Sequence, residues 1–233
     1  MQRKCDFVIV TKNLRLAERC VASIQEDCKE YLGSIVMVMR PETQYTTGAD
    51  QGWRAGREEF VCFVNDDAFP TGKALRRMFE TFEYEERVGA TGPCIPCRTH
   101  QGSSPPADKP LVVEVPFLVS GCLLVRRSVL EEVGGWDTKY ILYACDIDLS
   151  FRMVDAGYKL VWVRDAWVNH IMGSTESKVE ARAEIDKKDH DLLNDKFPGR
   201  FMEECSIVPT EPVRERPSSG WDGISQQRYE MAR

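Results

Sequence analysis

Residues 60–67 have the sequence FVCFVNDD, a run of five apolar residues followed by an asparagine and two aspartates. Five consecutive apolar residues predict a strand buried on both faces, which is typical of the centre of a parallel sheet. In open α/β sheets, ligands bind beyond the carboxyl ends of the strands. Asp66 and Asp67 therefore stand where a ligand site is expected.

Strand-like and helix-like segments alternate on both sides of this run. The strand-like segments are residues 7–10, 35–39, 112–115, 118–125 and 160–163, and the helix-like ones are residues 17–28, 75–82 and 146–157. Such alternation predicts an α/β domain with a largely parallel sheet flanked by helices. Ser128 and Glu131 have the spacing of a capping box and predict the start of a further short helix, which ends at Gly134 and Gly135.

The remaining segments are polar. Residues 45–57 contain several glycines and carry no strand or helix pattern, and residues 102–110, rich in Ser, Pro and Gly, predict a flexible flap. The charged residues 174–194 are expected to be helical. Three prolines after Cys205 predict that the chain ends in an extended arm or a disordered tail.

Composition excludes several classes of protein. The 233 residues include 31 Lys and Arg against 37 Asp and Glu, a net charge of −6, and this balance argues against binding of nucleic acid. No apolar run reaches the roughly 18 residues that cross a bilayer, and the first residues do not resemble a signal peptide. We therefore expect a soluble, cytoplasmic protein with no transmembrane segment.

The nine cysteines are scattered along the chain. An odd number of cysteines at apolar positions favours a reducing compartment over a disulfide framework. Cys94, Cys97 and His100 form the one cluster that suggests a metal. A structural zinc site usually needs four ligands, and no second cysteine pair lies nearby, so zinc is the weaker interpretation.

Two adjacent carboxylates at the end of a buried strand repel each other, and a divalent cation would relieve that repulsion. Oxygen ligands favour Mg²⁺ or Mn²⁺, which commonly bridge protein carboxylates to substrate phosphates. The alternative is that Asp66 and Asp67 simply open a turn before Pro70. The tripeptide NDD by itself favours the turn.

A series of motifs in the second half of the chain changes that balance. They are SGCLLVRR at 120–127, GGWD at 134–137, DIDLSFR at 146–152, AGY at 156–158 and VNH at 168–170. Their order and spacing resemble the inverting glycosyltransferases of family 2, particularly the rhamnosyltransferase-like members. The resemblance covers residues 7–170. It implies the GT-A fold, a Rossmann-like mostly parallel sheet flanked by helices, with a GT-A domain over residues 1–200 and a C-terminal arm or tail over 201–233.

The resemblance also implies a reaction, in which a sugar of the hexose type moves from a nucleotide-sugar donor to a hydroxyl group of a glycan, lipid-linked or protein acceptor. By this resemblance Asp146 is the catalytic base, which an alcohol needs because it is a poor nucleophile until its proton leaves. Asp67 and His170 would bind Mn²⁺ or Mg²⁺, which offsets the charge of the departing nucleoside diphosphate. For Asp146 the alternative is a helix cap, and for His170 it is an ordinary surface or core histidine.

The remaining predicted site residues contact the donor. Thr11 and Asn13 follow the first strand and match the start of the nucleotide-binding region, with Asp66 beside the metal motif. Gly121 would let the backbone approach donor or acceptor closely. Asp50 is a candidate for part of the donor contact, because residues 39–43 lack the aspartate that usually reads the base.

Two other hypotheses remain. Cys145 replaces the glutamate that usually precedes the base, which together with the missing base-reading aspartate favours a catalytically degenerate member that binds a nucleotide or glycan without turnover. A nucleotidyltransferase on a similar fold is less favoured. Such enzymes carry a glycine-rich, basic loop near the first strand, whereas residues 11–15 contain no glycine.

Overall fold

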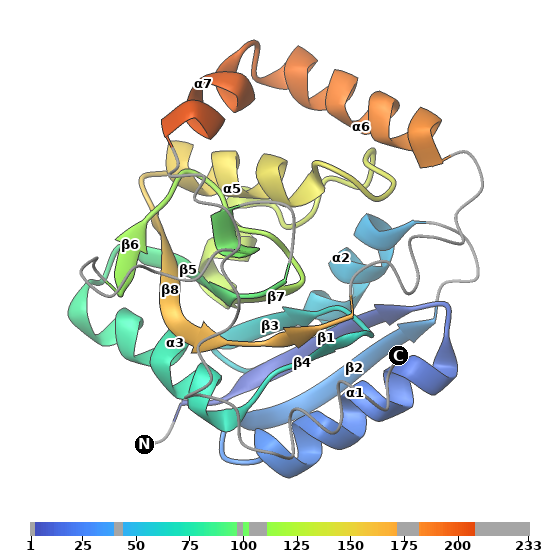
Figure 1. Ribbon diagram of the computed structural model, residues 1–233, viewed down its shortest axis with the longest axis vertical. Coiled ribbons are helices and arrows are strands. Elements are labelled where there is room, and N and C mark those ends of the chain that lie inside the picture. The colour runs from blue at the N-terminus through green and yellow to red at the C-terminus, as the bar shows by residue number, and fades with distance from the viewer. Residues whose placement is uncertain (1–2, 40–43, 97–99, 103–110, 172–181, 208–233) are drawn as a thin grey trace.

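The computed structural model of the protein describes residues 3–39, 44–96, 100–102, 111–171 and 182–207 (Figure 1). In this part of the chain the main sheet has seven strands in the order β2-β1-β3-β7-β5-β8-β6. Five run in one direction: β1 (Cys5–Thr11), β2 (Leu32–Met39), β3 (Phe60–Val64), β5 (Val88–Cys94) and β8 (Lys159–Trp167). The strands β6 (Val112–Glu114) and β7 (Cys122–Arg126) run in the other. The predicted mostly parallel sheet is confirmed.

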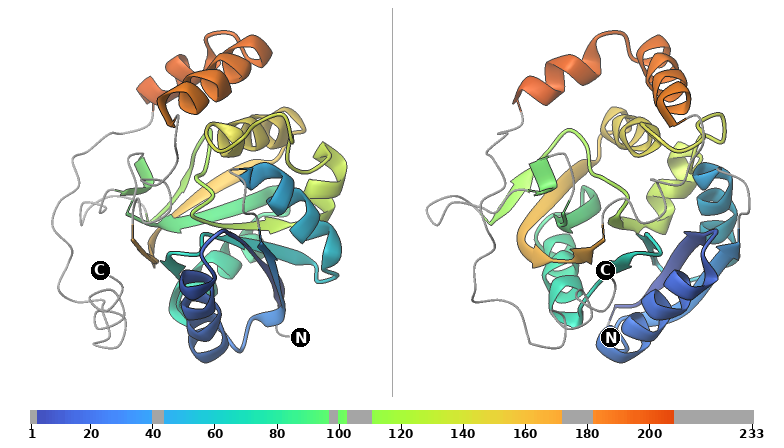
Figure 2. Two further views of the ribbon diagram at one scale, coloured as in Figure 1. Left: turned by 90° about the vertical axis from the view of Figure 1, so that its right-hand side faces the viewer. Right: turned by 45° about the vertical axis from the view of Figure 1, so that its right-hand side comes forward.

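Helices cover both faces of the sheet (Figures 1 and 2). On one face, α1 (Leu14–Asp27) and α3 (Gly72–Tyr84) pack on a buried hydrophobic cluster. On the other, α2 (Tyr45–Ala55), α4 (Arg127–Val133) and α5 (Cys145–Asp155) pack on a second cluster. The helices α6 (Arg182–Lys196) and α7 (Arg200–Ile207) lie over α5, outside this second layer.

The strand β3 is the centre of the fold. All five of its residues are buried, and its side chains alternate between the two hydrophobic clusters. This burial on both faces is what the apolar run at 60–64 predicts, because a strand covered by helices on each side has no polar face. The carboxyl end of β3 therefore leads directly from the core to Asn65, Asp66 and Asp67.

The helix α2 occupies the polar, glycine-containing segment that carries no pattern in the sequence. It packs on β1 and β2, and its Gly52 explains the missing signal. A Cβ atom at Gly52 would lie 2.3 Å from Cγ1 of Val8, so the glycine allows the helix to approach the sheet closely. A residue that disfavours an isolated helix is thus required by packing.

Several boundaries differ from the prediction, and two of them lie around β7. The helix α4 begins at Arg127 without a side-chain cap, so the predicted capping box at Ser128 and Glu131 is wrong. The start of this helix is instead fixed by the sheet, because the N–H of Arg127 donates to the carbonyl of Glu59. The strand β7 begins at Cys122, and residues 118–121 form an irregular approach to it rather than the predicted strand.

A second, two-stranded sheet joins β4 (Ala68–Phe69) to β9 (Asn169–His170). The two strands are antiparallel, with Ala68 opposite His170 and Phe69 opposite Asn169. This short sheet fastens the segment that follows β3 to the segment that follows β8. It places residues about one hundred positions apart side by side.

A buried carboxylate ties together the opposite end of the main sheet. Asp6, at the start of β1, is 2% exposed and forms an ion pair with Nη2 of Arg127 at 2.7 Å. It also accepts hydrogen bonds from the hydroxyl of Ser34 and from the N–H groups of Arg57 and Glu58. Four segments of the chain therefore depend on this one side chain.

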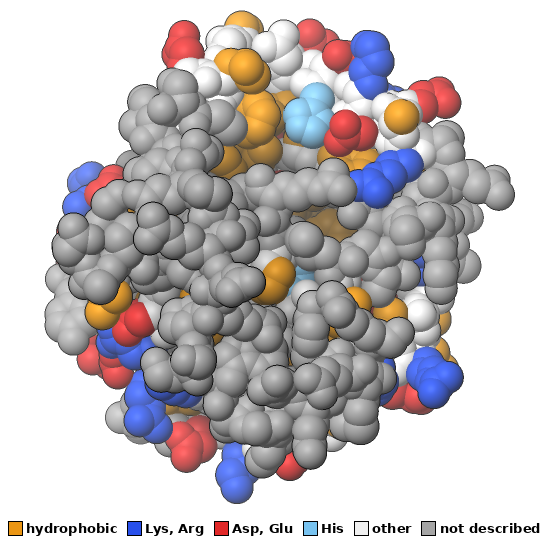
Figure 3. Space-filling model, in the orientation of Figure 1, with side chains coloured by type: hydrophobic (Ala, Val, Ile, Leu, Met, Phe, Trp, Pro, Cys, Tyr) orange, Lys and Arg blue, Asp and Glu red, His pale blue; other side chains and the backbone are white. Residues whose placement is uncertain are grey.

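The C-terminal helices α6 and α7 pack against the rest of the described chain, and the predicted division into a domain and an arm stays a prediction. The helix α7 crosses the boundary predicted at residue 200, and Phe201 packs with its ring centroid 5.8 Å from that of Phe117. Over α6 and α7, at the top of Figure 3, acidic and basic side chains are interspersed with hydrophobic ones. The predicted flap (except Gly102), residues 174–181 of the predicted helix and residues 208–233 lie outside the described residues.

Seven cysteines within the described ranges are buried, as expected for thiols at apolar positions. Cys94 is among them, but Cys97 lies outside the described residues, so the cysteine–histidine zinc hypothesis stays a prediction. In the part of the chain that the structure describes, no helix is both long and apolar enough to cross a membrane.

Candidate active site

The carboxyl ends of β1 and β3 bring together three predicted donor-binding residues. The two strands are parallel neighbours, so Thr11 at the end of β1 reaches the segment after β3. The hydroxyl of Thr11 donates to Oδ2 of Asp66 over 2.5 Å and accepts from the N–H of Asn13 over 2.8 Å. The side chain of Asn13 caps α1 by accepting from the N–H of Leu16. Asn13 therefore has a structural role, and its contact with a donor stays a prediction.

Asp67 and His170 face each other directly. Oδ1 of Asp67 lies 3.0 Å from Nε2 of His170, and both side chains are largely buried. The backbone holds this pair in place, because the N–H of Ile171 donates to the carbonyl of Asp67 over 3.0 Å. The other ring nitrogen of His170, Nδ1, lies 2.9 Å from the carbonyl oxygen of Pro96. A carbonyl only accepts, so Nδ1 carries a proton and Nε2 is the atom turned toward Asp67.

Two opposing effects act on the pKa of His170. Burial lowers it, because it disfavours the imidazolium form, but the hydrogen bond and negative charge of Asp67 outweigh burial, and the pKa is raised overall. Asp66 and the carbonyl of Pro96 act in the same direction as Asp67. In the absence of a cation, a proton on Nε2 therefore neutralises part of the negative charge at this point.

The Asp67–His170 pair fits a divalent cation. An octahedral ion with bonds of about 2.1 Å holds adjacent ligand atoms about 3.0 Å apart, and Oδ1 and Nε2 lie 3.0 Å from each other. The hydrogen bond from Nδ1 to Pro96 orients the ring as the outer partners of metal-bound histidines do. Within the described ranges no cluster of three or more His, Cys, Asp or Glu side chains forms a complete site. Mg²⁺ and Mn²⁺ commonly take their other ligands from water and substrate phosphates.

Gly121 lies against this pair. The N–H of Asn65 donates to its carbonyl over 3.1 Å. A Cβ atom at Gly121 would lie 2.8 Å from Cδ1 of Ile95 and 3.9 Å from Cε1 of His170. The close packing that this glycine allows is with Ile95, and its approach to donor or acceptor stays a prediction.

Asp146 is bonded to Ser120, the residue that precedes Gly121. Its Oδ2 accepts from the N–H of Ser120 over 3.0 Å, and its Oδ1 accepts from the N–H of Ile147 over 3.0 Å. Burial raises the pKa of Asp146, although these amide donors act against the rise. The residue as a whole is half-buried at the first turn of α5. The two residues Ser120 and Gly121 thus connect the candidate base to the candidate metal ligands.

Comparison with known proteins identifies the architecture. The structure superimposes on GalNAc-T7 bound to UDP, GalNAc and Mn²⁺ with a TM-score of 0.61 and 12% identity, covering 92% of this chain and 59% of that one. It also superimposes on the mannosyltransferase PcManGT of Pyrobaculum calidifontis, bound to GDP-Man and Mn²⁺, with a TM-score of 0.56 and 12% identity. This superposition covers 89% of this chain and 74% of that one. The chain has the GT-A fold. The predicted fold class is therefore confirmed.

Sequence relatives are rhamnosyltransferases by name. No family model matches the sequence. It is 43% identical to the N-acetylglucosaminyl-diphospho-decaprenol L-rhamnosyltransferase of Mycobacterium tuberculosis over 65 residues. This match covers 28% of this chain and 20% of that protein. Over 161 residues it is 26% identical to the O-antigen chain rhamnosyltransferase WbaN of Salmonella anatum, 60% of this chain and 50% of that one. The matches span half or less of these relatives' length, and they confirm the resemblance to rhamnosyltransferase-like GT-A proteins.

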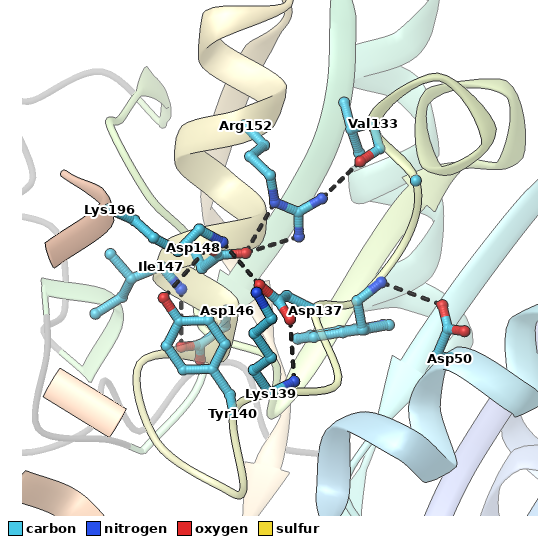
Figure 4. Close-up of polar contacts among 12 residues, drawn as sticks. Asp50, Val133, Asp137, Lys139, Tyr140, Asp146, Ile147, Asp148, Arg152 and Lys196 are labelled. Carbon is cyan, nitrogen blue, oxygen red and sulfur yellow. Dashed lines mark hydrogen bonds and ion pairs between the residues drawn. The ribbon is translucent and has the colours of Figure 1, made fainter. Parts of the chain in front are cut away.

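Asp50, the remaining predicted donor contact, has its contacts in a different part of the structure from Asp66 and Asp67. Its carboxylate accepts from the N–H of Trp136 over 3.3 Å (Figure 4). It also accepts from Nε1 of Trp53 over 2.8 Å and forms an ion pair with Arg54. These described contacts join α2 to the turn at 134–136, whereas no described contact links Asp50 to Asp66 or Asp67. The structure therefore does not bring Asp50 to the other site residues, and its contact with the donor stays a prediction.

Two residues around Asp146 were not predicted as site residues from the sequence. Ser120 supplies the amide that holds the carboxylate, and Tyr45, at the start of α2, lies close enough for Asp146 and Ser120 to affect its pKa. Burial is the largest effect on Tyr45 and raises that pKa. Ser120 belongs to a motif quoted from the sequence, so a signal existed. Tyr45 had none, because the segment around it carries no helical pattern.

Asp148, two residues after Asp146, is fully buried in a polar network (Figure 4). It accepts from Nε of Arg152 over 2.8 Å and from the hydroxyl of Tyr140 over 3.2 Å, and it forms an ion pair with Lys196 of α6. Lys196 also pairs with Asp137 at 2.9 Å. The start of α5 is thereby linked to α6 and to the loop that precedes Asp146.

Proposed function

We propose that the protein is a metal-dependent inverting glycosyltransferase that moves a sugar from a nucleotide-sugar donor to a hydroxyl group of a glycan, lipid-linked or protein acceptor. The observation that carries this proposal is the arrangement around Ser120 and Gly121. Asp146 is bonded to the first of these residues, and His170, paired with Asp67, lies against the second. Displacement at a sugar carbon by a hydroxyl needs a base for the attacking group and positive charge for the leaving diphosphate, and these neighbouring residues connect candidates for both.

The donor belongs on the Asp67 side. Asp67 and His170 would hold Mn²⁺ or Mg²⁺, which when bound supplies positive charge that offsets the charge of the leaving nucleoside diphosphate. Thr11 and Asp66, at the ends of β1 and β3, are bonded to each other and form the wall beside that pair. Ligands in α/β sheets bind at these strand ends.

The acceptor belongs on the Asp146 side. Its carboxylate would accept the proton of the attacking hydroxyl, and the raised pKa makes it a stronger base than an exposed aspartate. The amides of Ser120 and Ile147 fix its direction. Attack from this side, opposite to the departing diphosphate, inverts the configuration of the sugar carbon.

Cys145 favours the alternative of a binding protein without turnover. Its thiol is 2% exposed and packed in the hydrophobic cluster beside α5, and burial raises its pKa well above the usual value. It therefore cannot replace the carboxylate that this position usually carries in the resembling family. Only Asp146 remains there as a base, so the two functions differ in what happens when Asp146 is changed.

The test is release of nucleoside diphosphate from a panel of nucleotide sugars in the presence of Mn²⁺. The sequence relatives described above are named rhamnosyltransferases, so an activated rhamnose is the first donor to include. We expect turnover that requires the cation and that Asp67→Asn weakens strongly. Absence of turnover together with absence of Mn²⁺-dependent nucleotide binding would contradict the proposal, whereas binding without turnover would establish the alternative.

A further inference from the structure

A loop of four residues, 140–143, leads into α5 and therefore sets the position of Asp146. Three consecutive N–H groups of this loop point at one buried carboxylate, that of Asp189 on α6. The N–H of Ile141 donates to Oδ1 over 3.1 Å, and those of Leu142 and Tyr143 donate to Oδ2 over 2.8 Å each. Asp189 is 0% exposed. A carboxylate is the side chain best suited to this task, because each of its oxygens accepts more than one hydrogen bond.

The opposite side of the loop is held by α2. The N–H of Tyr45 donates to the carbonyl of Ile141 over 2.9 Å, and the hydroxyl of Thr46 donates to the carbonyl of Tyr140. Thr46 is also 0% exposed. The loop is therefore fixed from two helices at once, its amides by α6 and its carbonyls by α2.

The backbone at the end of the loop needs such support. Ala144 has φ = +55°, and within the described ranges it is the one residue other than glycine with a positive φ. A side chain disfavours this conformation, so it persists where surrounding contacts hold it. The carbonyl of Ala144 accepts the N–H of Asp148 and so begins the helix that carries Asp146.

We propose that Asp189 is a positioning residue for Asp146. By gathering the three loop amides it holds Ala144 in its unfavourable conformation and keeps the candidate base directed at the amide of Ser120. Asp189 does not touch substrate in this proposal. The inference rests on the proposed function, since it assigns Asp189 to the orientation of the proposed base.

The test compares Asp189→Asn with Asp191→Asn. Asp191 lies on the same helix, but its side chain is 62% exposed and it pairs with Lys187, so it controls for a lost charge on α6. In Asp189→Asn the side-chain amide turns an NH₂ group, which is a donor, toward loop N–H groups that need an acceptor. We expect kcat to fall between about 10- and 100-fold, because small displacements of a catalytic group cost that much, while the KM for the donor changes less than about twofold. The pH dependence of kcat should also shift, because the amides that set the pKa of Asp146 are displaced.

Amide hydrogen exchange gives a second readout that needs no turnover. We expect faster exchange in Asp189→Asn at residues 141–143 and also at Ser120 and Ile147, the two donors to Asp146, with no change in Asp191→Asn. Faster exchange at 141–143 alone, with kcat per folded molecule and its pH profile unchanged, would show that Asp189 only stabilises the loop and would overturn the proposal. If Asp189→Asn does not fold, Thr46→Val loosens the same loop from α2, and the same pattern is expected there. Failure of the wild-type protein to turn over any donor is a separate result, and it counts against the proposed function.

Discussion

At the scale of single residues, the proposed role of Asp146 as the catalytic base can be tested by substitution. The change Asp146→Asn keeps an acceptor for the amide of Ser120 but removes the base. We expect kcat to fall by about 10²- to 10⁴-fold, which is the usual contribution of general base catalysis, with donor affinity unchanged within about twofold. Steady-state release of nucleoside diphosphate and calorimetric titration with donor measure the two quantities. Unchanged turnover would contradict the assignment, and Asp195→Asn, an exposed position on α6, is the control.

The raised pKa of Asp146 predicts the pH dependence of turnover. Burial raises this pKa above the value of about 3.9 that an exposed aspartate has. The base acts only when it is deprotonated, so kcat should increase with pH, and the half-maximal point should lie above that of an exposed aspartate. A pH profile of kcat at saturating donor and Mn²⁺ measures it. A half-maximal point at or below about pH 4 would mean that Asp146 is not the group that limits the rate.

His170 couples the binding of a cation to pH. Its pKa is raised in the folded protein, so in the absence of a cation the imidazolium stabilises the fold below the unfolded pKa of about 6.5. That stabilisation is lost as the pH rises through the folded pKa. A cation needs the ring without the proton on Nε2. We therefore expect Mn²⁺ to raise the Tm more at about pH 8 than at about pH 6.

Thermal unfolding at the two pH values, with and without Mn²⁺, measures this difference. In His170→Gln the metal-induced shift should be smaller, because one ligand is weakened, and its dependence on pH should disappear. A shift that is equal at both pH values in the wild-type protein would show that His170 does not bind the cation.

At the scale of elements, the stability of the sheet depends on Asp6. The change Asp6→Ala leaves Arg127, whose side chain is 12% exposed, without its carboxylate partner. Removing one member of a buried ion pair costs about 3–5 kcal/mol. Urea denaturation should show a loss of this size, whereas Lys187→Ala, in the exposed pair with Asp191, should change little.

The same substitution should leave the site intact. Asp6 lies at the start of β1 and Thr11 at its end, so the ion pair and the candidate site are at opposite ends of the sheet. Mn²⁺-dependent nucleotide affinity of the folded Asp6→Ala protein should equal that of the wild type. A weakened affinity would mean that the two ends of β1 are coupled.

The elements also show how far the sequence predicts the structure. The strand β3 was predictable because its five apolar residues report burial on both faces. The helix α2 was not, because Gly52 is there for close packing on Val8, which the sequence does not reveal. The two-residue strands β4 and β9 are too short for any pattern, although they bring Asp67 and His170 together. Asp189 is one aspartate among many charged residues of α6, and only its burial distinguishes it.

At the scale of the whole molecule, the net charge of −6 opposes the binding of an anionic donor. In the proposed site, the diphosphate would also meet Asp66 and Asp67 when no cation is bound. Salt screens such repulsion, so raising the ionic strength from about 0.03 to about 0.3 M should strengthen binding of the nucleoside diphosphate to the metal-free protein. Titration calorimetry measures this effect, and the corresponding nucleoside, which lacks phosphates, should show little dependence on salt. Weaker binding at high salt would mean that basic side chains dominate the contact.

The buried thiols divide between the two faces of the sheet. Cys5, Cys20, Cys28, Cys62 and Cys122 belong to the cluster under α1 and α3, while Cys94 and Cys145 belong to the cluster on the side of α5. A maleimide can reach these sulfur atoms only when the layer above them opens. Mass spectrometry of the labelled peptides would therefore measure the rate at which each helical layer opens, separately for the two faces of the sheet. The chain carries, in its native cysteines, two sets of probes for its own partial unfolding.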